Sequence, residues 1–237
     1  MAEPEFTEYA DRESKELLDA LLSCREDDHT RYQAIMHSLG RRLASVAAKK
    51  IQSLPAHDVY VVCTVEDADF LARGVIEEFE SVFRHEREVR LACFWNKEKY
   101  VPGGKKELET APILKTYEEP VSPNCVMVVV KSIVSGACVV ATNIMHAATK
   151  LDPTRIFVIA PVMLHGAQDR LASNFDWQVS RRFDLCTFRI DHEKSADGNV
   201  NPGIGGAVYG RYGFGDATKK NFVVPDIVKS RRSAIAK

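Results

Sequence analysis

The first sign of a chemical site lies between a strand and a helix near the middle of the chain. Residues 126–130 are apolar and rich in valine, which is typical of a strand buried on both faces of a parallel sheet. After the polar residues 131–136, Val140, Ile144 and Ala148 recur at helical spacing. A serine- and glycine-containing turn before a helix is a ready anion site, because the first helical N–H groups lack partners and carry positive partial charge. The alternative is an ordinary strand-to-helix connection.

A second candidate region is the stretch 201–216, which holds six of the 13 glycines. Glycine loses much conformational entropy on folding, so this density suggests tight turns or a backbone that lies against a ligand. A flexible loop is the alternative, but the interleaved apolar side chains, among them Ile204 and Tyr212, favour an anchored segment.

Three acids, Glu66, Asp67 and Asp69, follow another predicted buried strand, residues 59–63. Ligands of parallel sheets bind at the carboxyl ends of the strands, so we expect residues 64–69, 131–136 and 161–166 to lie near one another. The acids then face a cation, or they occupy an exposed helix start, where carboxylates are favourable.

Strands and helices alternate along the chain. Strands are predicted at 59–63, 89–95, 113–117, 126–130, 155–160 (ended by Pro161) and 185–190, and helices at 70–83 and about 137–148. The alternation predicts an α/β fold with a largely parallel sheet flanked by helices. Two earlier helices, 14–22 and about 30–54, predict a helical N-terminal section, residues 1–54, that forms one globular unit with residues 55–237. The polar segment 96–110 is expected to form an arm.

The composition excludes several classes of partner. The 237 residues are 45% hydrophobic and 27% charged, enough for a substantial core, and the net charge of -1 provides no positive field for nucleic acid. No apolar run approaches the roughly 20 residues that span a bilayer, and the acidic N-terminus is unlike a signal peptide. We therefore predict a cytoplasmic protein without nucleic-acid or membrane partners.

The cysteines and histidines point to no metal site. The six cysteines contain no CxxC pair and the seven histidines no HExxH spacing. Buried reduced thiols are the expectation, because several cysteines lie inside apolar runs.

Much of the chain, from about residue 24 to 216, resembles the uracil phosphoribosyltransferase family, which has the type I phosphoribosyltransferase fold. Residues 25–30 are similar to the family's R-D-x-x-T region, and 95–117 lie where the family has its arm. Residues 128–139 fall on the loop that grips the ribose 5-phosphate. The tail resembles the uracil-binding segment P-G-L-G-D-A-G-D-R-x-x-G, in step at Pro202, Gly203, Gly205, Ala207 and Gly213, with Arg211 one residue after the arginine position of the pattern.

The resemblance implies pyrimidine salvage, in which uracil and phosphoribosyl diphosphate give uridine monophosphate and diphosphate. It implies no resident cofactor, with Mg²⁺ able to accompany the substrate, and a homodimer or higher homo-oligomer paired through the arm. The 5-phosphate would be held by Lys131, Ser132, Ser135, Gly136, Ala137 and Cys138. The base would meet Ile204, Gly205 and Gly206, and the diphosphate loop corresponds to Glu66 and Asp67. No catalytic residue is assigned.

Two positions reverse their charge relative to the family. The acid that would meet the ribose hydroxyls is Lys131, and the arginine of the diphosphate loop is Glu66, beside Asp67. Two like charges 4 Å apart repel by about 4 kcal/mol at an effective dielectric constant of 20, so these acids would repel a diphosphate unless magnesium bridged them. Three functions stay open: an active uracil phosphoribosyltransferase-like enzyme, an enzyme with an altered substrate, or a catalytically inactive or repurposed regulator or scaffold that binds a nucleotide or nucleobase.

Overall fold

The computed structural model describes residues 4–56, 58–100, 108–195 and 197–235. The strands in chain order are β1 (Glu5–Phe6), β2 (Asp58–Thr64), β3 (Glu88–Asn96), β4 (Lys99–Tyr100), β5 (Leu108–Thr110), β6 (Ile113–Glu118), β7 (Val126–Val130), β8 (Ile133–Val134), β9 (Arg155–Leu164), β10 (Phe183–Asp191), β11 (Glu193–Lys194) and β12 (Val200–Asn201). The helices are α1 (Arg12–Leu22), α2 (His29–Ile51), α3 (Leu71–Phe83), α4 (Cys138–Ala148), α5 (Ala167–Ala172), α6 (Trp177–Ser180), α7 (Val208–Arg211) and α8 (Asp226–Ile235), with short 3₁₀ helices η1 (Arg84–Glu86) and η2 (Lys219–Phe222).

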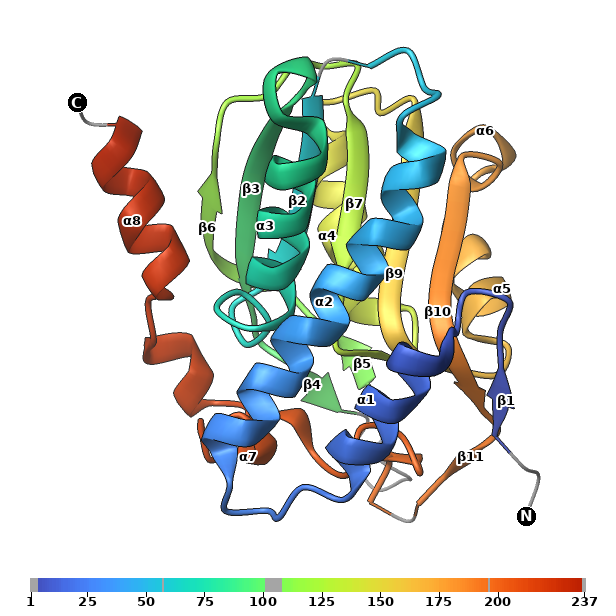
Figure 1. The fold of residues 1–237 in the computed structure, drawn as a ribbon. Coiled ribbons are helices and arrows are strands. Elements are labelled where there is room, and N and C mark those ends of the chain that lie inside the picture. Colours follow the sequence, from blue (N-terminus) through green and yellow to red (C-terminus); the bar gives the residue numbers. More distant parts are fainter. Residues whose placement is uncertain (1–3, 57, 101–107, 196, 236–237) are drawn as a thin grey trace.

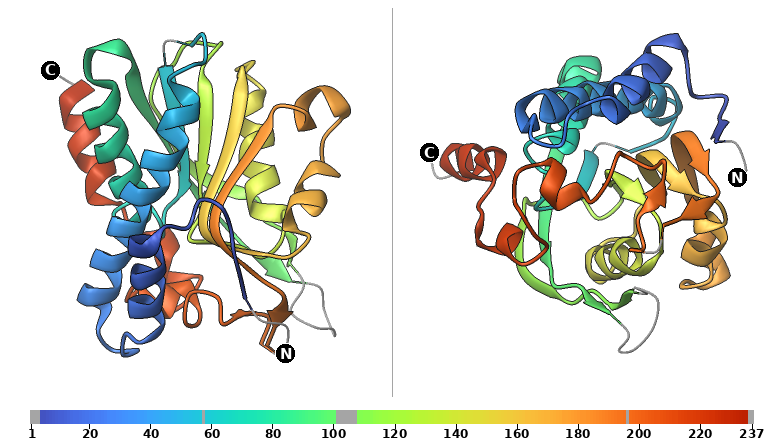
Figure 2. Two further views of the ribbon diagram at one scale, coloured as in Figure 1. Left: turned by 45° about the vertical axis from the view of Figure 1, so that its right-hand side comes forward. Right: turned by 90° about the horizontal axis from the view of Figure 1, so that it is seen from below.

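One large sheet organises the chain, with helices on both of its faces (Figures 1 and 2). Its strand order is β1-β10-β9-β7-β2-β3-β6, with β8 paired to β9. The inner strands run parallel, and the edge strands β1 and β6 run antiparallel to their neighbours. The prediction of an α/β protein with a largely parallel sheet flanked by helices is confirmed.

The apolar runs of the central strands are explained by their position. Every residue of β2 and of β7 is buried, because helices cover both faces of the sheet at this point. On one face, α1, α2 and α3 share a core with the sheet, and on the other face α4 and α5 share a second core.

Two glycines bring α2 and α3 into close contact. A Cβ on Gly40 would lie 2.1 Å from the carbonyl oxygen of Leu71, and a Cβ on Gly74 would lie 2.1 Å from that of His37. Helix α2 begins at His29, next to the predicted start at about residue 30, and the Asp28 side chain caps it by accepting from the backbone N–H of Arg31. The N-terminal helices are thereby packed directly on the α/β part of the chain.

Pro161 does not end its strand, and this prediction was wrong. β9 continues to Leu164, and the register with β10 pairs Ala160 with Thr187 and Val162 with Arg189 without a pair at Pro161. The carbonyl oxygen of Pro161 accepts a hydrogen bond from the Thr187 hydroxyl instead, at 3.3 Å. Pro161, which has no N–H to donate, therefore lies where the β9–β10 ladder lacks a pair.

The predicted arm is seen only at its base. β4 and β5 pair antiparallel, as an arm requires, and residues 101–107 between them lie outside the described residues. Within the described ranges, no helix combines the length and the apolar character needed to cross a membrane.

Candidate functional site

The order in which the chain adds strands reverses between β2 and β7. From β2 the chain moves outward to β3 and β6, and then returns to place β7 on the other side of β2. In open α/β sheets, ligands bind beyond the carboxyl ends of the strands at such a reversal. The segments after β2 and β7, residues 65–69 and 131–137, therefore define the candidate site, and the glycine-rich tail crosses the same end of the sheet (Figure 2, right).

A buried network of charges fills this corner. The Lys131 ammonium lies 2.7 Å from Oε1 of Glu66, 3.0 Å from Oδ2 of Asp67 and 3.3 Å from the Thr64 hydroxyl. The second oxygen of Glu66 lies 3.2 Å from Nζ of Lys220, which comes from the tail. The side chains of Glu66, Asp67 and Lys220 are at most 1% exposed. The two charge reversals found in the sequence are thus in direct contact and neutralise each other.

Lys220 completes the network from the other side. Its ammonium also lies 3.1 Å from the Tyr209 hydroxyl and 3.5 Å from Oε1 of Glu98, and it sits 4.5 Å from the centre of the Tyr209 ring. The Tyr209 hydroxyl donates to Glu98. Two carboxylates, a hydroxyl and an aromatic face together form a socket that suits a primary ammonium group.

Glu66 and Lys131 both hold their charges at neutral pH. Burial on its own would raise the pKa of Glu66, but Lys131 and Lys220 outweigh it and hold this pKa well below its usual range. Burial would likewise lower the pKa of Lys131, but Asp67 and Glu66 outweigh it and raise this pKa. Each group thus stabilises the charged form of the other.

The interpretation of the acids as an exposed helix start was wrong for Glu66 and Asp67, which are fully buried. The sequence pattern is the same in either case, and only their contact with Lys131 reveals the difference. Asp69 binds other partners than Glu66 and Asp67 do. It pairs with Arg73 and accepts from the backbone N–H groups of Asp226 and Ile227, so it fixes the start of α8.

The predicted phosphate loop divides into an inner and an outer part. Lys131 and Ser132 are buried, and the backbone N–H of Ser132 donates to Asp67. Ser135, Gly136, Ala137 and Cys138 lie at least partly at the surface. A Cβ on Gly136 would meet nothing within 4 Å, and no side chain caps the N-terminus of α4. The outer part is therefore open to solvent and leads into the start of α4, where no side chain caps the helix, an arrangement that suits an anion.

Three buried polar atoms in this corner have no hydrogen-bond partner within the described residues: Oδ1 of Asp67, Oγ of Ser132 and the hydroxyl of Tyr212. Burial raises the pKa of Tyr212, and the nearby Asp67 charge raises it further, which places both groups in one corner. Buried polar groups are normally hydrogen-bonded, and a side-chain hydrogen bond with Asp67 is among the causes that raise the Tyr212 pKa, so these two groups lie within reach of each other.

The tail turn is fixed by a buried ion pair at the end of β10. The N–H of Gly203 donates to Asp191 at 2.7 Å, and its carbonyl oxygen accepts from Arg189 at 2.5 Å. Arg189 and Asp191 are themselves 2.8 Å apart. Gly203 has φ +56°, and a Cβ there would lie 2.2 Å from the Val200 carbonyl oxygen and 3.4 Å from the Ile133 side chain. The tail therefore packs against β8, beside the phosphate loop.

The predicted base contacts differ in accessibility. Ile204 is buried, and its carbonyl oxygen accepts from the Tyr32 hydroxyl at 2.9 Å. The N–H of Gly205 donates to the carbonyl oxygen of Pro202 at 3.2 Å, whereas Gly206 is exposed. Of these three residues, Gly206 is the one whose backbone lies openly at the surface.

Sequence reasoning missed several residues of the site: Glu98, Arg189, Asp191, Tyr209, Tyr212 and Lys220. Nothing in the spacing of the tail distinguishes Lys220 from Lys219, whose side chain is 70% exposed. Arg189 and Asp191 alternate along a strand, and an outward-facing pair would show the same pattern.

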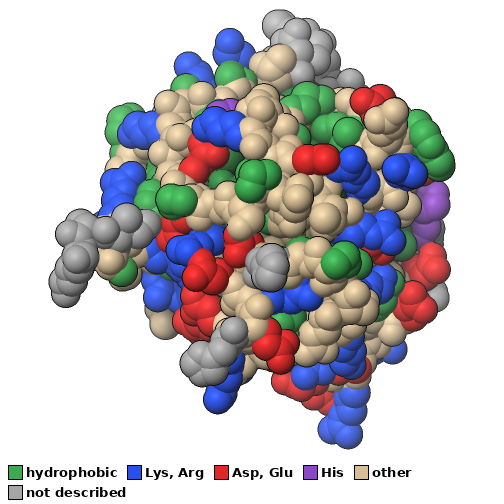
Figure 3. Space-filling model, turned by 90° about the horizontal axis from the view of Figure 1, so that it is seen from above, with side chains coloured by type: hydrophobic (Ala, Val, Ile, Leu, Met, Phe, Trp, Pro, Cys, Tyr) green, Lys and Arg blue, Asp and Glu red, His purple; other side chains and the backbone are tan. Residues whose placement is uncertain are grey.

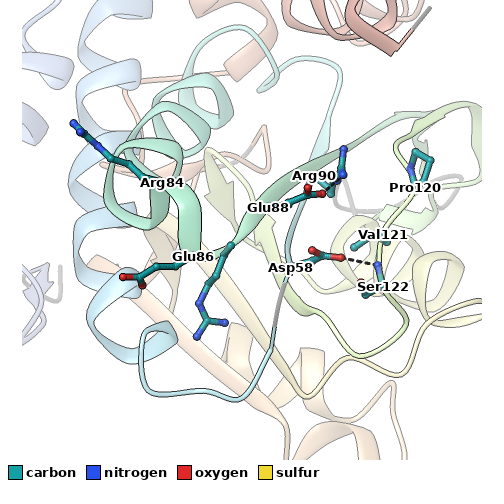
Figure 4. A pocket seen from close by; sticks show the side chains of 9 residues that line it. Asp58, Arg84, Glu86, Glu88, Arg90, Pro120, Val121 and Ser122 are labelled. Atoms are coloured by element: carbon teal, nitrogen blue, oxygen red, sulfur yellow. Dashed lines mark hydrogen bonds and ion pairs between the residues drawn. The ribbon is translucent and has the colours of Figure 1, made fainter.

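A cavity of about 870 Å³ lies at the opposite end of the sheet, where β2 and β3 begin. Its arginines do not converge on a common point (Figure 4). Arg87 donates to the carbonyl oxygen of Leu54 at 2.7 Å, and Arg90 pairs with Glu88. The face seen in Figure 3 carries basic and acidic side chains side by side. This cavity therefore offers no focused anion site.

The fold and the corner define the class of this protein: an α/β sheet covered on both faces, with a charged corner where the strand order reverses. No family model matches the sequence, and no curated protein matches it. Among solved structures, it is similar to the AQ2163 protein from Aquifex aeolicus, with a TM-score of 0.66 and 13% identity over 88% of this chain and 98% of that one. This likeness concerns the fold alone.

Weaker likenesses are to two purine phosphoribosyltransferases. The hypoxanthine-guanine phosphoribosyl transferase from L. donovani has a TM-score of 0.40 and 14% identity over 69% of this chain and 84% of that one. The APRTase from Giardia lamblia complexed with 9-deazaadenine has a TM-score of 0.41 and 9% identity over 66% of this chain and 81% of that one.

Proposed function

We propose that this chain is a phosphoribosyltransferase-like protein that binds a nucleotide through its phosphate and does not transfer a phosphoribosyl group. The observation that carries the proposal is the burial of the Lys131 ammonium between the carboxylates of Glu66 and Asp67. By the resemblance to the uracil phosphoribosyltransferase family, these are the positions that would contact the ribose hydroxyls and the diphosphate.

The geometry argues against diphosphate binding in this corner. A diphosphate would have to replace two ion pairs that are almost fully buried, and would meet Glu66 and Asp67 directly. Removing one partner of such a buried pair leaves an uncompensated charge, at a cost of about 3–5 kcal/mol. Lys131 also points at these acids, so it does not present its charge to a ligand.

Nucleotide binding is supported by the outer part of the loop. Ser135, Gly136 and Ala137 lead into the uncapped start of α4, and the space above Gly136 is open. A phosphate monoester needs only these backbone N–H groups and the serine hydroxyl. The exposed backbone of Gly206 is the remaining candidate contact for the base.

Two measurements test this function. Incubation of the protein with phosphoribosyl diphosphate, Mg²⁺ and labelled uracil is expected to give no uridine monophosphate. Calorimetry with uridine monophosphate is expected to show binding that Gly136→Asp weakens at least tenfold, because the new carboxylate occupies the anion site. Gly210→Asp is the matched control, since a Cβ at Gly210 also meets nothing within 4 Å.

The outcomes separate the competing functions. Catalytic formation of uridine monophosphate would show an active uracil phosphoribosyltransferase and refute the proposal. Equal loss of binding in both glycine variants would move the phosphate site away from this loop.

A further inference from the structure

A second cavity, of about 320 Å³, lies at the edge of the sheet. It is bordered by β9, β10, the start of α5 and the segment that follows β1 (Figure 1, right). Its volume falls in the range of small-molecule sites, about 300–1,000 Å³. The cavity lies on the β10 side of β9, whereas the phosphate loop contains β8, which pairs with the other side of β9. It is therefore separate from the candidate nucleotide site.

The path of the N-terminal segment leaves this space open. β1 pairs only two of its residues with β10. The chain leaves the edge at Thr7, whose backbone N–H donates to the carbonyl oxygen of Phe188 at 3.0 Å and whose hydroxyl donates to that of Thr187. Tyr9 borders the cavity beyond this point, and its hydroxyl accepts from the Lys50 ammonium at 2.9 Å. Within the described residues, no strand pairs with the outer edge of β10 before the two β1 pairs, so a gap remains between the N-terminal segment and α5.

Half of the residues that line the cavity are apolar. They are Tyr9, Met163, Leu164, Ala167, Leu185 and Ile190. Met163 and Ala167 are buried, and Leu185 and Ile190 are half-buried. An apolar ligand placed here would remove further hydrocarbon surface from water, which is the main source of affinity in such pockets.

The polar lining residues decide which ligands fit. The two hydroxyls are already engaged, since Thr7 donates to the carbonyl oxygen of Thr187 and Thr187 donates to that of Pro161 at 3.3 Å. The carboxylate of Asp169, by contrast, makes no hydrogen bond or ion pair with any other described residue. No lysine or arginine stands among the described residues of the lining. A lone carboxylate attracts a cation and repels an anion, so the cavity does not suit a phosphate.

We propose that this cavity binds a small organic cation with an apolar body, such as a primary amine that carries an aromatic ring. The ring lies against Met163, Leu185 and Ile190, and the ammonium group pairs with Asp169. This site is independent of the proposed nucleotide site, because the two lie on opposite sides of β9 and require ligands of opposite charge.

The test uses NMR of the full-length protein labelled with ¹³C at the methionine methyl groups. The chain has five methionines, of which Met163 lines the cavity and Met145, on α4, is 44% exposed and outside it. The probe is 2-phenylethylamine at pH 8, where an imidazole is neutral and a primary amine stays protonated. The Met163 signal, assigned with Met163→Leu, is expected to shift with saturation, whereas the Met145 signal is expected to stay in place.

A series of probes with the same ring separates charge from apolar contact. 2-Phenylethylamine is expected to bind more tightly than 2-phenylethanol, and phenylacetate more weakly than either. Asp169→Asn is expected to reduce the affinity for the amine by about two- to fivefold, as for a partly exposed ion pair, and to leave that for the alcohol unchanged. Asp19→Asn is the matched control, because Asp19 is exposed on α1 and does not line the cavity.

A cavity-filling variant tests the location. Leu185→Trp is expected to abolish the response of Met163 to both the amine and the alcohol. If Leu185→Trp does not fold, Ile190→Phe, at another half-buried position of the lining, takes its place.

Three results would overturn the proposal. One is a Met163 signal that does not respond to the amine up to its solubility limit. Another is phenylacetate that binds as tightly as the amine, since the lining would then not select a cation. The third is an equal affinity for the amine in Asp169→Asn and Asp19→Asn.

Discussion

Replacing Lys131 with methionine probes the physical basis of the candidate site most directly. The ammonium of Lys131 binds Glu66, Asp67 and the Thr64 hydroxyl, all of them buried. Methionine retains much of the side-chain volume and removes the charge. Glu66 keeps Lys220 as a partner at 3.2 Å. Asp67, in contrast, loses the cation that bonds its Oδ2.

The expected cost follows from the burial of the pair. Removing one partner of a buried ion pair costs about 3–5 kcal/mol, whereas an exposed pair contributes about 0–1 kcal/mol. With a urea m-value of about 3 kcal/mol/M, Lys131→Met is expected to lower the unfolding midpoint by about 1–1.7 M. Lys150→Met is the control, because Lys150 is 67% exposed and lies 3.7 Å from Glu118. Its midpoint is expected to stay within about 0.3 M of the wild type.

The pH dependence gives the same prediction a second signature. The pKa of Glu66 lies below its usual 4.5 in the folded protein, so this stabilisation is present above pH 4.5 and is lost as the pH falls through the folded value. The pKa of Lys131 lies above its usual 10.5, so its contribution is present below pH 10.5 and is lost as the pH rises through the folded value. In Lys131→Met, Glu66 regains a proton more readily. The difference in unfolding free energy from the wild type is therefore expected to shrink as the pH falls from 7 towards 4.5.

The assay is urea unfolding followed by circular dichroism at pH 7 and pH 5. Lys131→Met combined with Asp67→Asn should recover part of the lost unfolding free energy, since the second change removes the buried carboxylate charge that Lys131 no longer neutralises. A single variant as stable as the wild type at pH 7 would refute the reasoning. A cost that grew at low pH would refute it as well, because the sign of the linkage would be wrong.

Three further outcomes are expected. Gly203→Ala should lower the free energy of unfolding by more than about 1 kcal/mol, because φ is positive and the Cβ would lie 2.2 Å from a carbonyl oxygen; Gly210→Ala, in open space, should be neutral or slightly stabilising in the same urea titration. Tyr32→Phe should cost about 0.5–1.5 kcal/mol, since it removes the buried hydrogen bond to Ile204, and thermal unfolding measures this. Iodoacetamide should modify Cys138 before the five buried cysteines, and uridine monophosphate should slow that labelling, as mass spectrometry of tryptic peptides would show.

The fold could be predicted because its signals are local. The valine-rich β7 and the apolar β2 needed burial on two faces, and in the structure they pair with each other at the centre of the sheet. The start of α2 near residue 30 could be predicted for the same reason, since the side chain that caps the helix, Asp28, is its neighbour in the sequence. The prediction that the strand ends at Pro161 was wrong because a strand tolerates proline at a position where its hydrogen-bond ladder lacks a pair. Such a gap depends on the neighbouring strand, here β10, and not on the local sequence.

The sequence by itself determined the architecture and both charge reversals, because strand periodicity and residue type are written along the chain. Only the tertiary structure decided that Lys131 and Glu66, 65 residues apart, compensate each other, and that Lys220, 154 residues from Glu66, joins them. Whether an acid is solvated or paired depends on which segments the fold brings to it. Burial then sets the energy of that contact, since the same two charges attract weakly in water and strongly in the interior.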